Sequence, residues 1–225
     1  MFQRLRKSLH LVDTSECIVD CSDELAPEKV GLSATAVNKI WEAVETLYKT
    51  GTQPLISLCI RRRNQIIINR AIGHAKGNEP DQQTSGPVAP VSVDTPVCLY
   101  SSSKAVTAIL MHKLAEQGLI SLTDPVSAYL PEFARNGKHN ITILQVLSHR
   151  GGIPGLPSGM PQQAIFDRNA VWELLCEAKP IALDGKKLAY HAITGGFVLE
   201  RVVEKVTGKS IADYLNKTIR RPMAM

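Results

Sequence analysis

Two different hydrophobic patterns divide this 225-residue chain near residue 100. Before that point, two short runs rich in β-branched residues, LISLCI (55–60) and IIINRAI (66–72), flank the polar stretch RRRNQ (61–65). Runs of this kind on either side of a polar turn are typical of an antiparallel hairpin. After residue 100, apolar residues recur at helical spacing. The sequence therefore predicts a helix and an antiparallel hairpin followed by a helical region.

The expected domain boundaries follow from the same patterns. Residues 1–30 show no clear period, and we expect a loosely attached lead-in there. Residues 31–225 form the domain, with a helix and the hairpin in 31–100 and mainly helices in 101–225. Ser33 is the expected N-cap of the first helix and Gly51 its end. The apolar positions of that helix keep helical spacing: Val37, Ile40, Trp41, Val44, Leu47 and Tyr48.

The later helices are bounded by recognisable stop signals. A stripe of Val106, Ile109, Leu110 and Leu114 precedes Gly118, where we expect the first of them to end. Further helices are expected in 141–149, closed by Gly151 and Gly152, in 168–179 before Pro180, in 194–208 ending at Gly208, and in 210–219, where Ser210 and Asp213 resemble a capping box.

Lys104 stands at an unfavourable place in this pattern. The first turn of a helix carries partial positive charge, so that acidic residues are favoured there and lysine is not. Ser101 and Lys104 are three residues apart, which puts hydroxyl and amine on one helix face. Serine becomes a strong nucleophile only when a base removes its proton, and a lysine amine whose neutral form is favoured by its surroundings can be that base. The pair therefore indicates nucleophilic catalysis, although a Ser N-cap followed by an exposed lysine is the common structural alternative.

Composition excludes several other classes of function. The net charge is +5, from 26 basic and 21 acidic residues. The basic residues are scattered along the chain. Their densest cluster, Arg61–Arg63, lies between two apolar runs, which is more typical of a solvated hairpin turn than of a nucleic-acid-binding patch. The five cysteines show no CxxC spacing, so we expect no metal and a reducing compartment. No segment has the length of a signal peptide or a membrane span, and the expected location is cytoplasmic.

Three ordered segments resemble a known family. TPVCLYSSSKAVTAILMHKLAEQGLISLTDPVSAYLPEF, ITILQVLSHRGGIPGLP and LAYHAITGGFVLERVVEKVTGKSIADYLNKTIRRPMAM are similar to stretches of the serine β-lactamase and penicillin-binding-protein-like hydrolases. The resemblance is to the branch related to class C enzymes and β-lactamase-like esterases, whose signatures include an S-x-x-K element. It implies the β-lactamase/transpeptidase-like fold, which is an α/β (α+β) architecture with an antiparallel sheet layer plus an all-helical region, here incomplete at the C-terminus. It also implies no cofactor.

The resemblance also implies roles for individual residues. Ser101 would be the acylated nucleophile, Lys104 its proton-abstracting partner, and Tyr190 the second catalytic basic group. A phenol beside a lysine can shuttle a proton because its pKa drops there. Ser103 and His191 are expected to line the substrate pocket. For His149 we expect only a cation that complements the end of a helix.

Two departures from the family pattern shape the expected function. Ala192 stands where the usual Tyr-x-Asn motif has asparagine, whose side chain helps to hold a substrate amide. We therefore expect a serine hydrolase that acts through an acyl-enzyme on small carboxylic esters, with β-lactam or D-amino-acid peptide hydrolysis as the alternative. The second departure is that the family's third motif, a Lys/His/Trp-x-Gly strand that comes with one oxyanion-hole donor, is not found before Met225. Losing such a donor typically costs about a hundred- to a thousandfold in rate. The chain is thus expected to be truncated relative to the family. A further alternative is that it is a catalytically inactive remnant or a binding module.

Overall fold

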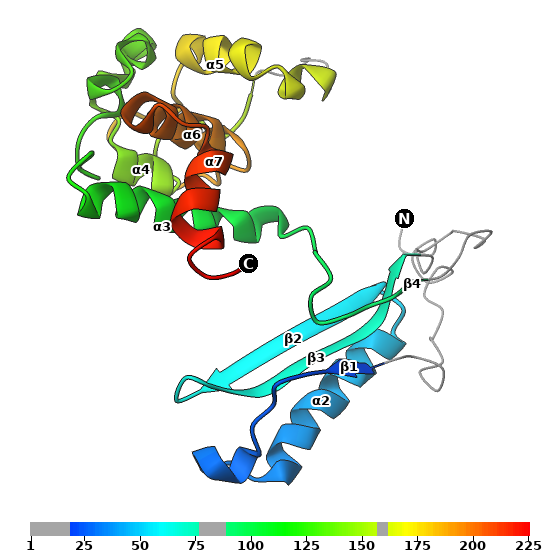
Figure 1. The fold of residues 1–225 in the computed structure, drawn as a ribbon. Coiled ribbons are helices and arrows are strands. Elements are labelled where there is room, and N and C mark those ends of the chain that lie inside the picture. The colour runs from blue at the N-terminus through cyan, green and yellow to red at the C-terminus, as the bar shows by residue number, and fades with distance from the viewer. Residues whose placement is uncertain (1–18, 77–88, 157–161) are drawn as a thin grey trace, which may run out of the picture. The chain divides into compact units, whose positions relative to one another are not determined.

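A computed structural model describes residues 19–76, 89–156 and 162–225 of the chain. Within it the chain divides into two compact units, which meet in sequence between Cys98 and Leu99. We call residues up to 98 the sheet unit and residues 99–225 the helical unit. The two are described separately below (Figure 1).

The sheet unit is built on an antiparallel hairpin. Strand β2 (Leu55–Arg62) pairs with β3 (Gln65–Lys76) in the register Leu55↔Gly73 to Arg62↔Gln65. The short strands β1 (Val19–Cys21) and β4 (Ala89–Pro90) also pair with β3. The hairpin that the β-branched runs predict is therefore present, with β3 at its centre.

The hairpin turn is shorter than the sequence suggests. Only Arg63 and Asn64 form it, both with positive φ, of 51° and 63°. A two-residue turn with both φ values positive matches the right-handed twist of the flanking strands. Arg61 and Arg62, which we expected in the turn, continue strand β2 instead. Their side chains are exposed, so the cluster is solvated as expected.

Helix α2 (Ala34–Lys49) packs on one face of this sheet (Figure 1). The Ser33 hydroxyl accepts a hydrogen bond from the Ala36 N–H, as expected for an N-cap. Gly51 follows the helix with φ +68°, in the left-handed region expected of a helix stop. The core of the unit is made by Val37, Trp41, Tyr48, Ile68 and Ile72. Ile40 and Leu47 of the predicted stripe are exposed, because the buried face is narrower than the spacing suggested.

Residues 19–30 are held to the sheet and are not a loose lead-in. Besides the β1–β3 pairing, the Glu24 carboxylate forms a bidentate ion pair with Arg70, with oxygen–nitrogen distances of 2.8 and 2.7 Å. The same carboxylate accepts a hydrogen bond from the Asn69 N–H. Val30 is buried at the end of a 3₁₀ turn. The pairing joins residues almost fifty positions apart, which periodicity cannot reveal. Residues 1–18 lie outside the described residues.

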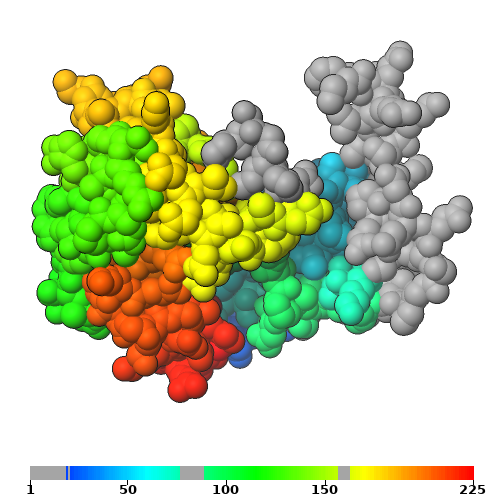
Figure 2. Space-filling model, turned by 90° about the horizontal axis from the view of Figure 1, so that it is seen from above, coloured from blue at the N-terminus to red at the C-terminus, as the bar shows by residue number. Residues whose placement is uncertain are grey.

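The helical unit begins with a 3₁₀ turn (Tyr100–Ser102) that leads directly into helix α3. Two of the α-helices described in this unit, α3 and α6, have 14 residues each, and three are shorter. The bounds are α3 (Ser103–Glu116), α4 (Ile143–Leu147), α5 (Arg168–Glu177), α6 (Thr194–Thr207) and α7 (Ile211–Leu215). In the space-filling view the green, yellow, orange and red segments of this unit pack directly against one another (Figure 2). A single core joins these helices, and its largest fully buried apolar members are Phe133, Leu110, Met111, Leu114, Ile143, Ile153 and Leu175.

Capping residues fix where several of these helices start. Thr142 and Gln145 form a complete capping box at α4, and Asp167 accepts two backbone N–H groups at α5. Ser210 caps α7 as expected, since its hydroxyl accepts the Asp213 N–H. The Asp213 carboxylate accepts from the Ser210 hydroxyl rather than from the Ser210 backbone N–H, so the expected capping box is not formed. On α3 the buried face contains Leu110, Met111 and Leu114, whereas Ile109 of the predicted stripe is exposed.

Candidate active site

The start of α3 presents Ser101 and Lys104 side by side. Ser101 lies in the 3₁₀ turn before the helix, and Lys104 lies in its first turn. The Lys104 Nζ donates a hydrogen bond to the Ser101 Oγ at 3.3 Å. Tyr100, just before the serine, has a φ of +45°, which is uncommon outside glycine. Such backbone outliers concentrate at functional sites, and this one shapes the turn that exposes Ser101.

Tyr190 reaches the same serine from the loop between α5 and α6. Its hydroxyl donates to the Ser101 Oγ at 2.7 Å across 89 sequence positions. The Lys104 Nζ lies 5.1 Å from the centre of the Tyr190 ring. The hydrogen bond to Ser101, followed by the neighbouring Lys104 amine, holds the pKa of the Tyr190 phenol below its usual value. A lowered phenol pKa makes proton exchange at this oxygen easier near neutral pH.

The structure thus brings together the three residues that the sequence nominates for catalysis. One exposed hydroxyl has two proton-transfer groups within hydrogen-bonding distance. This is the arrangement of a nucleophile with adjacent bases.

Ser103 takes part in the local turn rather than in a pocket. Its hydroxyl donates to the Tyr100 carbonyl at 2.6 Å, and the side chain is exposed. That bond helps to hold the backbone on which Ser101 sits. The substrate-binding role expected for Ser103 stays a prediction.

His191 is buried, with only 1% of its surface exposed. Its Nδ1 donates to the Ala189 carbonyl at 2.6 Å, and its Nε2 accepts the Ile153 N–H at 3.2 Å. Both ring nitrogens are therefore engaged by backbone. The ring borders a small, mostly apolar cavity of about 50 Å³ that Lys104 also lines. The expected contact of His191 with a substrate stays a prediction.

The neutral form of His191 gives a testable pH dependence. Burial lowers the pKa of this imidazole from its ordinary value of 6.5. The unfolded chain then binds the proton at a higher pH than the folded chain, so the free energy of unfolding falls as the pH drops below about 6.5. We expect the wild-type chain to lose on the order of 1 kcal/mol through this group between pH 7.5 and pH 5. Urea titrations of wild type and His191→Gln at both pH values measure it.

The variant is expected to be less stable at pH 7.5, and to lose less stability than the wild type on acidification. Carboxylates that titrate in the same range are common to both proteins and cancel in the comparison. An equal loss in the two proteins would show that His191 does not carry this pH dependence.

His149 is placed differently from what the sequence suggested. We expected it to act as a cation at a helix end, away from the nucleophile. Instead its ring lies 4.8 Å from the ring of Tyr190, tilted by 57°. Its Nδ1 accepts the His191 N–H at 3.2 Å. The expectation was wrong because this contact depends on a loop more than forty residues later in the chain.

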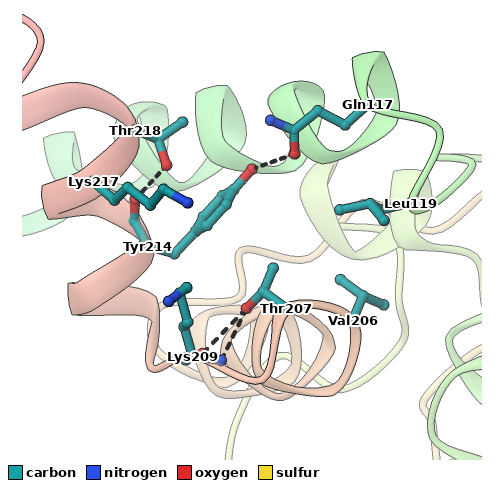
Figure 3. Close-up of a pocket in the computed structure, with 8 residues that line it drawn as sticks. All are labelled: Gln117, Leu119, Val206, Thr207, Lys209, Tyr214, Lys217 and Thr218. Atoms are coloured by element: carbon teal, nitrogen blue, oxygen red, sulfur yellow. Dashed lines mark hydrogen bonds between the residues drawn. The ribbon is translucent and has the colours of Figure 1, made fainter.

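A larger cavity lies elsewhere in the helical unit. It has a volume of about 480 Å³ and is lined by residues from the end of α3, the end of α6 and the α7 region. Figure 3 shows the Tyr214 ring in this cavity, with its hydroxyl donating to the Gln117 side-chain oxygen. Neither Ser101, Lys104 nor Tyr190 lines it. Its size alone therefore does not make it the catalytic site.

Comparison with known proteins identifies the family. The β-lactamase family model matches residues 42–225, and the chain belongs to this family. In its described parts it has the β-lactamase/transpeptidase-like fold, as the sequence resemblance implied. No helix among the described residues is long and apolar enough to cross a membrane. The expected cytoplasmic location stays a prediction.

The relatives include proteins named as esterases and a homologue of a penicillin-binding protein. The chain is 37% identical over 134 residues to the Mycobacterium tuberculosis (strain ATCC 25618 / H37Rv) protein named Esterase/beta-lactamase LipL, covering 60% of this chain and 31% of that protein. A family VIII carboxylesterase structure aligns with 28% identity and a TM-score of 0.73, over 86% of this chain and 51% of that one.

A penicillin-binding protein homologue from Caulobacter crescentus aligns with a TM-score of 0.75 and 24% identity, over 94% of this chain and 52% of that one. This likeness shows the fold alone. The chain thus spans about a third to a half of the length of the relatives that it matches.

Proposed function

We propose that this chain carries the nucleophile and the bases of a serine hydrolase that cleaves carboxylic esters through an acyl-enzyme. One observation carries the proposal: the Tyr190 hydroxyl and the Lys104 amine both contact the Ser101 Oγ, at 2.7 and 3.3 Å. Ser101 and Tyr190 are also exposed to solvent in the helical unit, so a substrate can reach them.

The proposed reaction proceeds in two balanced steps. In the first, the Ser101 Oγ attacks the ester carbonyl carbon while its proton passes to the Lys104–Tyr190 pair. The same proton then protonates the departing alkoxide, so that an alcohol leaves and the acyl group stays on Ser101. In the second, water attacks the acyl carbon by the reverse proton path, which releases the carboxylic acid and restores the serine.

Esters are favoured over amides by the residue two positions after Tyr190. Ala192 is exposed and has no side-chain group that could hydrogen-bond a substrate amide. An ester places no such N–H in the site, and its alcohol is a better leaving group than an amine. The esterase names among the relatives support the same choice.

Hydrolysis of β-lactams or D-amino-acid peptides is the second candidate. Other relatives are named as D-alanyl-D-alanine carboxypeptidases and class C β-lactamases, which is the observation that favours it. A chain of this kind that binds such compounds without turning them over is the third.

Parallel assays with p-nitrophenyl acetate, p-nitrophenyl butyrate and a chromogenic cephalosporin separate these candidates. We expect hydrolysis of both esters above the rate of the Ser101→Ala variant, and little or no opening of the cephalosporin. Faster turnover of the cephalosporin than of the esters would favour the second candidate. Equal rates for wild type and Ser101→Ala with every substrate would contradict the proposed hydrolase.

A further inference from the structure

His149 occupies an unusual backbone position directly after α4. Its φ is +61°, a left-handed conformation that ends the helix, whereas the sequence pattern assigned this stop to Gly151 and Gly152. Histidine adopts this region more often than most non-glycine residues. The conformation turns both the carbonyl and the ring of His149 toward the loop that carries Tyr190.

Two hydrogen bonds join His149 to the backbone on either side of Tyr190. The Ala189 N–H donates to the His149 carbonyl at 2.9 Å. The His191 N–H donates to the His149 Nδ1 at 3.2 Å. The residues before and after the tyrosine are thus both fixed by one residue of a distant segment.

The ring of His149 restrains the tyrosine side chain as well. It packs against the Tyr190 ring, with 4.8 Å between centroids. Tyr190 is 53% exposed, so that few other contacts limit its rotation. The bond between the Tyr190 hydroxyl and the Ser101 Oγ requires one particular ring direction, which these contacts favour.

We propose that His149 is a positioning residue, which holds the Tyr190 hydroxyl on Ser101 by fixing the backbone on both sides of the tyrosine and by packing against its ring. This inference rests on the proposed function, because it takes Tyr190 as a catalytic group. His149 acts through Tyr190, since its described hydrogen bonds and ring contacts go to the tyrosine and its two neighbours. It supplies a ring nitrogen that accepts the His191 N–H, a carbonyl oxygen that accepts the Ala189 N–H, and a ring face.

The backbone conformation provides a matched pair of variants. Glycine and asparagine both tolerate positive φ, so neither His149→Gly nor His149→Asn introduces backbone strain at this position. Both also keep the carbonyl that receives the Ala189 N–H. Asparagine retains a side-chain oxygen close to the position of Nδ1, whereas glycine retains no acceptor for the His191 N–H. The exposed Leu188 of the same loop provides the control variant Leu188→Ala.

Kinetics of Ser101 acylation test the positioning role. We expect His149→Gly to lower kcat about 10- to 100-fold, since small displacements of a catalytic group cost that much. The KM should change less than kcat, because the hydrogen bonds of His149 go to the loop that carries Tyr190. His149→Asn should restore most of the rate, and Leu188→Ala should match wild type. Equal rates for His149→Gly and wild type, or for His149→Gly and His149→Asn, would overturn the proposal.

A second readout does not depend on turnover. With tyrosine labelled at the ring carbon that bears the hydroxyl, NMR follows the ionisation of Tyr190 in each variant, and Tyr190→Phe assigns its signal. The contact with Ser101 and Lys104 lowers this pKa in the wild type. We therefore expect His149→Gly to raise the midpoint toward 10 and His149→Asn to leave it near the wild-type value. An unchanged midpoint in His149→Gly overturns the inference even in a chain without activity, whereas failure of Ser101 to react overturns only the proposed function.

Discussion

Replacing Lys104 by alanine is expected to slow the acylation of Ser101 by about a thousandfold. The variant removes one of two proton-transfer groups that contact the Ser101 Oγ. It also removes the amine that helps to lower the pKa of Tyr190, so a smaller fraction of the phenol is ionised near neutral pH and able to accept a proton. Presteady-state acylation by p-nitrophenyl acetate measures the rate for each variant.

Lys104→Arg separates proton transfer from simple charge. Arginine keeps the positive charge near the phenol, but a guanidinium does not act as a base at ordinary pH. If the amine accepts the serine proton, Lys104→Arg should be nearly as slow as Lys104→Ala. An arginine variant with most of the wild-type rate would contradict a base role for Lys104. Lys113→Ala is the matched control, since this lysine lies on the same helix and pairs with Glu116 on the surface.

The Lys104 variants should not unfold the protein. A lysine in the first turn of a helix opposes the partial positive charge of the helix N-terminus. Its removal is therefore expected to leave the unfolding free energy unchanged or to raise it by a few tenths of a kcal/mol. Loss of activity in a chain of equal or greater stability indicates that the residue is retained for chemistry.

Replacing Lys138 by methionine is expected to destabilise the helical unit by about 3 kcal/mol or more. Lys138 is fully buried, and its Nζ donates to three backbone carbonyls, those of Arg135, Cys176 and Ala178, at 2.6 to 2.8 Å. Burial lowers the pKa of this amine, as desolvation of an ammonium does. Methionine fills a similar volume but leaves three carbonyls without their donor.

The contacts of Lys138 explain why so large an effect is expected. Cys176 and Ala178 lie at the end of α5, where helix carbonyls have no partner inside the helix. The ammonium satisfies them and complements the negative end of the helix dipole. It also joins α5 to the irregular 3₁₀ segment around Arg135, where Asn136 and Gly137 have positive φ. One side chain thus ties together two parts of the core that differ by about forty residues in sequence.

Urea unfolding followed by Trp172 fluorescence measures this effect in the helical unit alone. The chain has two tryptophans, and Trp41 of the sheet unit is replaced by phenylalanine in every variant compared. Lys179→Met is the control, because Lys179 is exposed two residues after α5 and should cost less than 0.5 kcal/mol. Equal midpoints for Lys138→Met and Lys179→Met would contradict a stabilising role of the buried ammonium.

Local signals in the sequence predicted most of the fold. The caps at Ser33 and Ser210 and the stop at Gly208 depend on residues a few positions apart, and the structure confirms them. The hairpin was equally accessible, since its strands adjoin in sequence. Strand β1 was missed because three residues carry no period, and only pairing with β3 makes them a strand.

The same distinction between local and distant contacts applies to the residues of the candidate site. Ser101 and Lys104 are one helical turn apart, so that spacing alone suggested their contact. Tyr190 came from the family resemblance, because nothing local joins it to a serine 89 positions earlier. His149 and Lys138 were misjudged or overlooked for this reason. Both look like ordinary surface cations in the sequence, and their roles arise only from segments about forty residues away.

The identity of the acylated residue is the most direct test of the central claim. The full chain is incubated with a fluorophosphonate, and the intact mass and the modified peptide are determined by mass spectrometry. We predict one adduct per chain, on Ser101, that forms slowly in Lys104→Ala and is absent from Ser101→Ala. Labelling of Ser101→Ala at the wild-type rate, or an adduct on a different residue, would contradict the claim that Lys104 and Tyr190 activate Ser101.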